Sequence, residues 1–399
     1  MKLATRLQLI KPSPTLMVTV QVAALRRQGI EVIDFGAGEP DFDTPEHIKE
    51  GAITALKQGK TKYTPVGGTA ELKEAIIAKL QRENGFTYSM PEVTSNCGGK
   101  HTLFNAFHAL FEAGDEVLIP APYWVSYSDM VILTGATPKL LPTSEQTGFK
   151  ITAAQLQAAI GPRSKALLLN SPSNPTGAAY TEAELKEIAD VVEKSSLLVI
   201  SDDVYEKFLY DSSRCPHILT LKPHLRDRVL IANSVSKTYA MTGWRLGYAA
   251  GPKELISAIE TLQSQSTSNP TSIAQAAAVV ALTGPQESVG VMAKEFAKRR
   301  NYVVDRLRAM PGITCTLPEG AFYVFPRVSS YFGAKWQDKK ITSAMDLSLY
   351  LLQESKVALV AGEGFGSTDH VRISYATSMK NLEQGLNQIE AGLKKLLPL

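Results

Sequence analysis

The chain alternates short, largely apolar runs with longer stretches of helical periodicity, and this alternation constrains its fold more than any other feature. The runs have the length of strands and cover residues 116–119, 166–169, 197–200, 229–232 and 246–249. Strands that are apolar on both faces and separated by helices indicate a mostly parallel sheet covered on both sides. The sequence therefore predicts an α/β fold in which ligands bind beyond the carboxyl ends of the strands.

The remaining segments extend this pattern at both ends. Further strands are predicted at 32–35, 313–317 and 371–375, and helices at 18–27, 47–58, 102–111, 287–310, 344–354 and 379–396, with a long helical stretch at 253–281 broken near Asn269. Thr69 is expected to cap a helix, and Thr181 with Glu184 forms a capping box. A length of 399 residues suggests more than one domain. We expect a large domain at 46–288 and a smaller α+β domain built from 1–45 and 289–399.

Composition excludes several classes of function. A net charge of +3 gives no polybasic footprint for nucleic acid. No apolar run is long enough to span a membrane, and the N-terminal residues lack the apolar core of a signal peptide. The three cysteines, Cys97, Cys215 and Cys315, are far apart and have no metal-ligand spacing. They predict a reduced, cytoplasmic protein with buried thiols and no metal.

Polar and aromatic side chains follow the predicted strands by a few residues. Because the carboxyl ends of parallel strands meet at one edge of a sheet, we expect these side chains to converge on a small-molecule site. No strand is followed by a Gly-x-Gly-x-x-Gly pattern, which excludes a nicotinamide-binding Rossmann domain. The convergent residues are Trp124, Asn174, Asp202, Tyr205, Ser234 and Lys237.

The stretch around Lys237 has the residue types that surround a phosphorylated aldehyde. Lysine forms Schiff bases with carbonyl groups, while the hydroxyls of Ser234 and Ser236 and the guanidinium of Arg245 are donors suited to a phosphate. The Gly98–Gly99 turn at a helix start exposes backbone N–H groups to an anion. As a bare pattern, this stretch is also typical of a surface lysine beside ordinary serines, so other motifs must decide.

Taken together, the motifs distinguish a cofactor site from an ordinary surface lysine. The chain carries Gly-Glu-Pro-Asp-Phe at 38–42, Pro-Tyr-Trp at 122–124, Asn-Pro-Thr-Gly at 174–177, Asp-x-x-Tyr at 202–205, Ser-x-Ser-Lys at 234–237, Gly-Trp-Arg-Leu-Gly at 243–247, Gly-Ala-Phe-Tyr at 320–323 and Arg-Ile-Ser at 372–374. In this order they resemble the class I aminotransferases of the aspartate aminotransferase fold, which use pyridoxal phosphate (PLP). Residues 11–15 and 98–100 resemble the bacterial and plant branch, which contains aspartate and aspartate/prephenate aminotransferases.

The resemblance implies roles around the cofactor ring. Lys237 would form the Schiff base with PLP and then carry the proton between the substrate α-carbon and the cofactor. Asp202 would pair with the pyridine nitrogen, and Tyr205 and Asn174 would hydrogen-bond the phenolic oxygen. Trp124 would stack on the ring face. Asp203, which is outside the motif, is expected to be a solvated or capping residue.

The resemblance also implies a phosphate site shared between subunits. Tyr63 would reach the phosphate of the neighbouring subunit, so the active site would depend on a homodimer. The phosphate contacts within one chain would come from Ser234, Ser236, Arg245 and the backbone around Gly99 and Lys100.

For the substrate, Arg372 would make a two-pronged contact with the α-carboxylate, next to Gly38, Trp124 and Asn174. Animal and enteric aspartate enzymes bind the distal carboxylate with an arginine of the partner subunit, but residues 264–269 contain none here. The distal carboxylate would instead meet Lys100, with Ser13 and Thr15.

The implied reaction is transfer of the amino group of L-aspartate to 2-oxoglutarate, with prephenate as a second acceptor. Within the fold, the alternatives are a transaminase for aromatic or neutral amino acids and a β-lyase. A binding module without turnover is the alternative from another class. The joint presence of Lys237, Asp202 and Arg372 argues against such a module, because a mere binder has little use for an electron-sink carboxylate.

Overall fold

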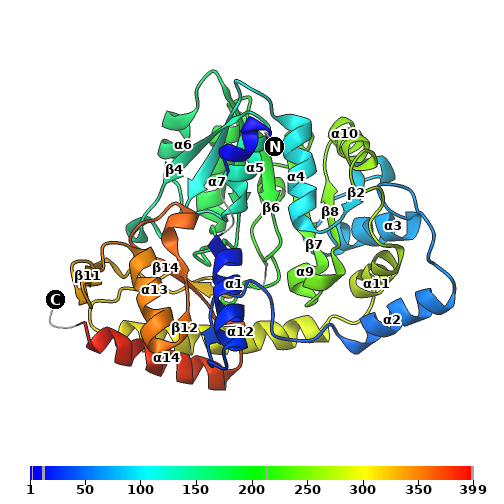
Figure 1. The fold of residues 1–399 in the computed structure, drawn as a ribbon. Coiled ribbons are helices and arrows are strands. Elements are labelled where there is room, and N and C mark those ends of the chain that lie inside the picture. The colour runs from blue at the N-terminus through cyan, green and yellow to red at the C-terminus, as the bar shows by residue number, and fades with distance from the viewer. Residues whose placement is uncertain (2, 11–13, 213, 397–399) are drawn as a thin grey trace.

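A seven-stranded sheet forms the centre of the molecule, which is a computed structural model describing residues 1, 3–10, 14–212 and 214–396 (Figure 1). The strand order is β2-β8-β7-β6-β5-β3-β4. Strand β8 runs antiparallel to both neighbours, and the other pairings are parallel. The mostly parallel sheet predicted from the sequence is therefore confirmed. Its strands are β2 (Val93–Asn96), β3 (Glu116–Ala121), β4 (Thr137–Pro142), β5 (Ser164–Asn170), β6 (Leu198–Asp202), β7 (Val229–Ser234) and β8 (Gly247–Ala250).

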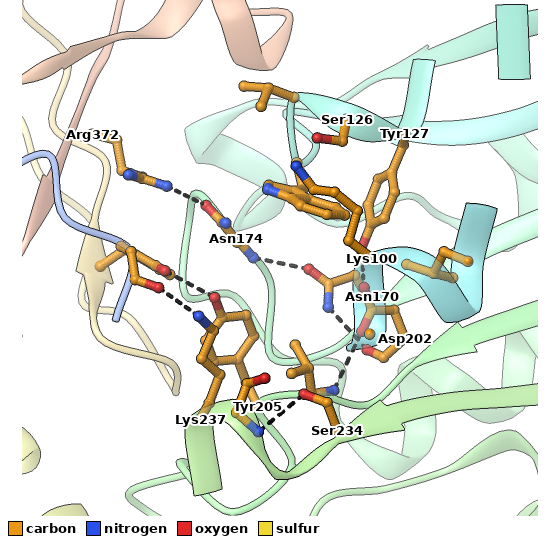
Figure 2. A pocket seen from close by; sticks show the side chains of 18 of the residues that line it. Lys100, Ser126, Tyr127, Asn170, Asn174, Asp202, Tyr205, Ser234, Lys237 and Arg372 are labelled. Carbon is orange, nitrogen blue, oxygen red and sulfur yellow. Dashed lines mark hydrogen bonds between the residues drawn. The ribbon is translucent and has the colours of Figure 1, made fainter. Parts of the chain in front are cut away.

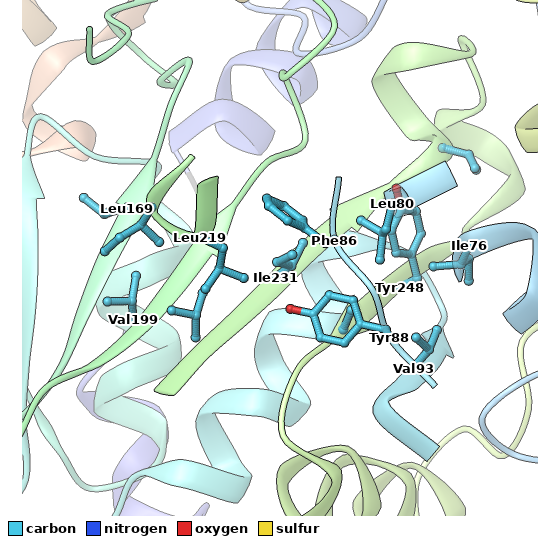
Figure 3. Close-up of a cluster of buried hydrophobic side chains, with 14 of the residues drawn as sticks. Ile76, Leu80, Phe86, Tyr88, Val93, Leu169, Val199, Leu219, Ile231 and Tyr248 are labelled. Atoms are coloured by element: carbon cyan, nitrogen blue, oxygen red, sulfur yellow. The ribbon is translucent and has the colours of Figure 1, made fainter. Parts of the chain in front are cut away.

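Both faces of the sheet are covered because successive strand residues point to opposite sides. Leu167 and Leu169 of β5 pack into one apolar cluster, while Ala166 and Leu168 pack into another. The first cluster, part of which is drawn in Figure 3, is completed by α3 (Ala70–Lys79), α7 (Glu182–Glu193) and α11 (Ser272–Thr283). The second is completed by α4 (Gly99–Leu110), α5 (Ser126–Leu133) and α10 (Lys253–Ser264). Burial on both faces explains the uninterrupted apolar runs.

A separate apolar cluster joins the two ends of the chain. Phe35 packs there with α12 (Glu287–Arg308), α13 (Ala344–Ser355) and α14 (Met379–Lys394), and Figure 1 shows α12 and α14 side by side along the lower edge. Strand β1 (Ile33–Asp34) pairs in parallel with β12 (Val357–Ala358). The division at residues 45 and 288 stays a prediction, and Tyr205 and Phe208 also enter this cluster.

The other predicted elements lie close to their predicted positions except for one strand, and some elements, among them β4 and α5, were not predicted. Thr69 and Thr181 accept hydrogen bonds from the backbone as helix N-caps, and the chain is not helical between Ser264 and Ser272. The strand predicted at 313–317 is wrong, because only Thr314 makes a bridge. Strand β4 was missed because its half-exposed edge position leaves no continuous apolar run. The remaining helices and short strands are α1 (Pro14–Arg27), α2 (Glu46–Lys57), α6 (Ala153–Ala159), α8 (Ile218–Leu221), α9 (Val235–Thr238), β9 (Tyr323–Val324), β10 (Lys335–Trp336), β11 (Lys339–Lys340), β13 (Val360–Ala361) and β14 (Val371–Ser374).

Several expectations from composition can be compared with the structure. Within the described residues, no helix is long and apolar enough to cross a membrane, and no three His, Cys, Asp or Glu side chains are grouped for a metal ion. All three cysteines are free thiols. Only Cys315 is fully buried, and Cys97 and Cys215 are half-buried, so the prediction of uniformly buried thiols is wrong.

Candidate active site

A cavity of about 280 Å³ opens at the carboxyl ends of β5, β6 and β7 (Figure 2). The register of the sheet creates it: Asn170 is aligned with Asp202, and Asp202 with Ala232, two residues before Ser234. The predicted site residues that line this cavity are Gly38, Gly99, Lys100, Trp124, Asn174, Asp202, Tyr205, Ser234, Ser236, Lys237, Arg245 and Arg372. The structure thus brings together side chains from segments more than 300 positions apart.

Lys237 lies in α9, a four-residue helix that begins directly after β7. Ser234 caps this helix by accepting a hydrogen bond from the Ser236 amide, which fixes the direction in which Lys237 leaves the sheet. The Lys237 Nζ donates to the Gly38 carbonyl oxygen at 2.6 Å. Burial lowers the pKa of Lys237 to about 8, against the opposing effect of Glu39. A substantial fraction of this amine is therefore neutral near pH 8, as a nucleophile requires.

Asp202 ends β6 and faces the cavity from its floor. The Tyr127 hydroxyl donates to its Oδ2 at 2.5 Å, and the Val204 amide donates to its Oδ1 at 3.3 Å. Burial nevertheless raises the pKa of Asp202 to about 6. A cation brought next to this carboxylate would favour its ionised form. The site is therefore suited to a protonated ring nitrogen.

Sequence reasoning missed Tyr127 and Asn170. Tyr127 follows the predicted Trp124 by three residues, and the two rings meet edge to face with centroids 5.2 Å apart. Asn170 is the last residue of β5; its Nδ2 donates to the Asp202 backbone oxygen at 2.9 Å and its Oδ1 accepts from the Asn174 amide at 2.9 Å. The strand-end rule that selected Asp202 could have selected Asn170 too.

Asp203 corrects another expectation, because it is neither solvated nor a helix cap. It is 7% exposed, and its Oδ1 accepts a hydrogen bond from the Ser201 hydroxyl at 2.6 Å. Its Oδ2 lies 3.3 Å from the His217 Nε2. Successive residues at a strand end point to opposite sides, so Asp203 turns away from the cavity that Asp202 faces. Its contacts bind neighbouring segments together behind the site.

Three features at the start of α4 form a cradle for an anion. Gly99, the first residue of the helix, places backbone N–H groups at the positive end of the helix dipole. Ser234, Ser236 and Arg245 line the same cavity, and Ser234 and Arg245 lie next to Gly99 and Gly98. A Cβ on Gly98, whose φ is +93°, would lie 2.4 Å from an Arg245 guanidinium nitrogen. The glycine is therefore required for Arg245 to approach the helix start, and the cradle fits a phosphate group.

Arg372 is a buried cation whose polar contacts are uncharged. It is 1% exposed; its Nη1 donates to the Asn174 Oδ1 at 3.0 Å and its Nη2 to the Gly36 oxygen at 2.7 Å. Its buried Nε has no hydrogen-bond partner in the described part of the chain. Burial lowers the pKa of this guanidinium. A buried cation with a free donor is suited to bind a carboxylate.

A second cation lies across the cavity, as Figure 2 shows for Lys100 and Arg372. The Lys100 Nζ is 4.9 Å from the centroid of the Trp124 ring. Burial and the nearby Arg245 lower the pKa of Lys100. Two cations on opposite sides give the cavity the polarity that a molecule with two carboxylates requires.

Among the predicted residues that the structure describes, Tyr63 does not line the cavity of its own chain. Tyr63 is 90% exposed and lies in the loop between α2 and α3. Ser13 and the side chain of Thr15 lie outside the described residues. The roles assigned to these three residues stay predictions.

The mostly parallel sheet and the cavity at its carboxyl edge suit an aminotransferase, and comparison with known proteins identifies the same class. The family model "Aminotransferase class I and II" matches residues 30–389. The chain belongs to this aminotransferase family, and the resemblance drawn from its motifs is confirmed.

Three similar proteins have more specific names than the family. The chain is 48% identical over 392 residues to an aspartate aminotransferase of Geobacillus stearothermophilus, with 98% of each chain covered. It is 50% identical over 391 residues to an aspartate/prephenate aminotransferase of Cereibacter sphaeroides, again with 98% of each covered. A crystal structure of the aspartate aminotransferase from Rhizobium meliloti superposes with a TM-score of 0.95 at 46% identity, covering 99% of this chain and all of that one.

Proposed function

We propose that this aminotransferase uses PLP to move the amino group of L-aspartate to 2-oxoglutarate, with prephenate as a second acceptor. One observation carries the proposal: a single cavity holds the desolvated amine of Lys237, the buried carboxylate of Asp202, and the two cations Arg372 and Lys100. The relatives named for aspartate or for aspartate and prephenate support this choice of substrates.

The residues fit PLP group by group. Ser234, Ser236, Arg245 and the N–H groups at the start of α4 would hold its phosphate, and Lys237 would bond its aldehyde carbon. Asp202 would pair with its ring nitrogen, while Tyr205 and Asn174 would face its phenolic oxygen and Trp124 its ring. Bound PLP supplies an electron sink for the carbanion formed at the substrate α-carbon.

Lys237 would also accept the proton of the substrate α-carbon. An amine whose pKa is about 8 is close to the optimum for general base catalysis near neutral pH. Once displaced by the substrate amine, Lys237 would accept the proton from the substrate α-carbon. The Gly38 carbonyl, which accepts a hydrogen bond from the Lys237 Nζ, restrains the amine in the cavity meanwhile.

The two cations would select the substrate. Arg372 would fix the α-carboxylate with the guanidinium donors directed into the cavity, and Lys100 would meet the distal carboxylate. A lysine is a flexible point charge and discriminates geometry less strictly than an arginine fork. Both aspartate and the bulkier prephenate would then be accepted.

We also propose a cytoplasmic homodimer. The three free thiols agree with a reducing compartment. Tyr63 is an exposed aromatic residue outside the cavity of its own chain, as expected of a residue that reaches a neighbouring subunit. Sedimentation of wild-type protein and of a Tyr63→Ala variant, together with their PLP content, would test this arrangement.

The experiment is a single-turnover absorbance measurement on the purified yellow protein. It is mixed separately with L-aspartate, L-glutamate, L-phenylalanine and L-arogenate. Fast bleaching with aspartate and glutamate is expected, and bleaching with arogenate would support the use of prephenate. Bleaching with phenylalanine alone would favour an aromatic transaminase, and pyruvate release from cystathionine would favour a β-lyase.

A Lys100→Ala variant tests the distal contact. We expect slower bleaching with aspartate and little change with alanine, which has no distal carboxylate. Equal rates of wild type and variant with aspartate would contradict the role proposed for Lys100.

A further inference from the structure

Tyr323 belongs to the Gly-Ala-Phe-Tyr motif, yet the function proposed above gives it no task. It is fully buried on β9 and lines the cavity. Its hydroxyl oxygen lies 2.8 Å from that of Tyr205. Its ring lies beneath the Arg372 guanidinium, 4.5 Å from centroid to carbon. One side chain thus contacts both a residue assigned to the cofactor and the residue assigned to the substrate carboxylate.

The surroundings leave Tyr323 little freedom. Its backbone is paired with Ser374 on β14, the strand that also carries Arg372. The Phe322 ring packs against it with centroids 4.7 Å apart. A Cβ on Gly38 would approach its hydroxyl to 3.3 Å, so the absence of a side chain there makes room for the phenol. The position of Tyr323 is fixed by the fold before any ligand binds.

We propose that Tyr323 is a positioning residue with two separable actions: its hydroxyl orients the Tyr205 phenol toward the cofactor, and its ring holds the Arg372 guanidinium. This inference rests on the proposed function, because it needs PLP beside Tyr205. None of the cofactor or substrate contacts assigned above involves Tyr323. Its effect would be to link the cofactor site with the site of the substrate carboxylate.

The first action, orienting the Tyr205 phenol, depends on the direction of the hydrogen bond between the Tyr205 and Tyr323 hydroxyls. A distance of 2.8 Å allows either hydroxyl to donate. Only when Tyr323 donates is the Tyr205 hydrogen free to reach the phenolic oxygen of the cofactor. Accepting this bond also makes Tyr205 a stronger donor, because linked hydrogen bonds polarise one another. Tyr205 would then stabilise negative charge on the cofactor oxygen.

The test is a spectral pH titration of the PLP-loaded protein without substrate. In Tyr323→Phe, the pH midpoint of the colour change is expected to rise by roughly half a unit, since the weaker Tyr205 bond stabilises the deprotonated form less. The ring remains, so KM for aspartate should stay within about twofold, while kcat falls. In Tyr323→Leu the ring is also lost, and KM should rise by roughly three- to thirtyfold.

Tyr375→Phe is the matched control. Tyr375 is also fully buried, and its hydroxyl donates to the Ala321 oxygen at 3.1 Å rather than to Tyr205. It should lose a comparable buried hydrogen bond with no change in the midpoint. Equal midpoints for wild type and Tyr323→Phe would overturn the inference, as would the same shift in Tyr375→Phe. Wild-type protein that neither binds PLP nor bleaches with aspartate would overturn the proposed function instead.

Discussion

Lys79 is buried in the protein interior and Lys237 lies at the wall of the cavity, and their surroundings shift their pKa values in opposite directions. Lys79, at the end of α3, is 3% exposed; it forms an ion pair with Glu206 and lies 3.6 Å from Glu83. Burial alone would lower the pKa of Lys79, but these two carboxylates raise it overall. Lys237 donates to a neutral carbonyl, and burial lowers its pKa to about 8.

The difference teaches that burial lowers the pKa of a lysine unless neighbouring carboxylates offset it. Lys79 remains a cation and links α3 to the turn after β6, where Glu206 also accepts a hydrogen bond from Asn233 at 2.7 Å. Around Lys237, burial is the largest effect on the pKa; Glu39 and Asp202 raise this pKa while Arg245 and Arg372 lower it, so the charges do not offset burial. The first arrangement stabilises structure, and the second produces a reactive amine.

The largest expected effect is on activity. Lys237→Ala removes the general base, so kcat/KM for aspartate should fall by about 10²–10⁴-fold or more. The free energy of unfolding should not decrease, because the variant no longer buries an amine that favours its neutral form. Steady-state kinetics and urea unfolding measure both quantities. A variant with wild-type turnover would remove Lys237 from the mechanism.

Lys79→Met should show the reverse pattern. Removing one partner of a buried ion pair leaves Glu206 as an unpaired buried charge, which costs about 3–5 kcal/mol of unfolding free energy. Turnover at a temperature where the variant is folded should stay near that of the wild type. The double variant Lys79→Met/Glu206→Gln should recover part of the loss. Full stability of the single variant would show that the pair contributes nothing.

Arg372→Lys tests the cations around Lys237. The fork to the α-carboxylate is lost while the charge remains, so kcat/KM should fall by roughly ten- to a hundredfold. Most of the loss should appear in KM. Arg306 on α12 pairs with Glu390 on α14, away from the cavity. An Arg306→Lys variant is the matched control, and it should leave the kinetics unchanged. A similar loss in both variants would point to a general effect on folding.

Tyr127→Phe tests Asp202, the carboxylate in the cavity that Lys237 also lines. The Tyr127 hydrogen bond lowers the pKa of Asp202, which burial has already raised to about 6. Its removal should therefore raise this pKa further in the PLP-free protein, by up to about one unit. A pH titration of the PLP-free variant and wild type, followed by NMR or infrared spectroscopy of the carboxyl group, measures the shift. A shift to lower pH would contradict the assignment.

The smallest effect concerns the acid stability of the Lys79 region. The pKa of Glu206 is lowered from 4.5 to about 2, despite burial, chiefly by Lys79. A depressed carboxyl pKa gives stability that is present above 4.5 and is lost as pH falls toward 2. In that window the double variant Lys79→Met/Glu206→Gln should lose up to about 1.4 kcal/mol less per pH unit than the wild type. Equal slopes would refute the pairing.

Much of the fold and site could be predicted because the relevant signals are local. Apolar runs report strands buried on both faces, and the side chains of Thr69 and Thr181 satisfy amide groups within their own first helical turn. The strand-end rule found Asp202 and Ser234 because parallel strands place their carboxyl ends at one edge. The strand predicted at 313–317 failed for the complementary reason: a strand needs a partner, and Thr314 has one only at a single bridge.

By itself, the sequence determined the order of elements, the family and the residues that follow each strand, since these depend on neighbours along the chain. Only the tertiary structure decided which lysine is paired with a carboxylate, that Asp203 is buried, and that Tyr127 and Tyr323 line the cavity. The Lys79–Glu206 pair spans 127 positions and the Tyr205–Tyr323 contact 118. Charge and burial act through space, so the properties of these groups arise only when the folded chain brings them together.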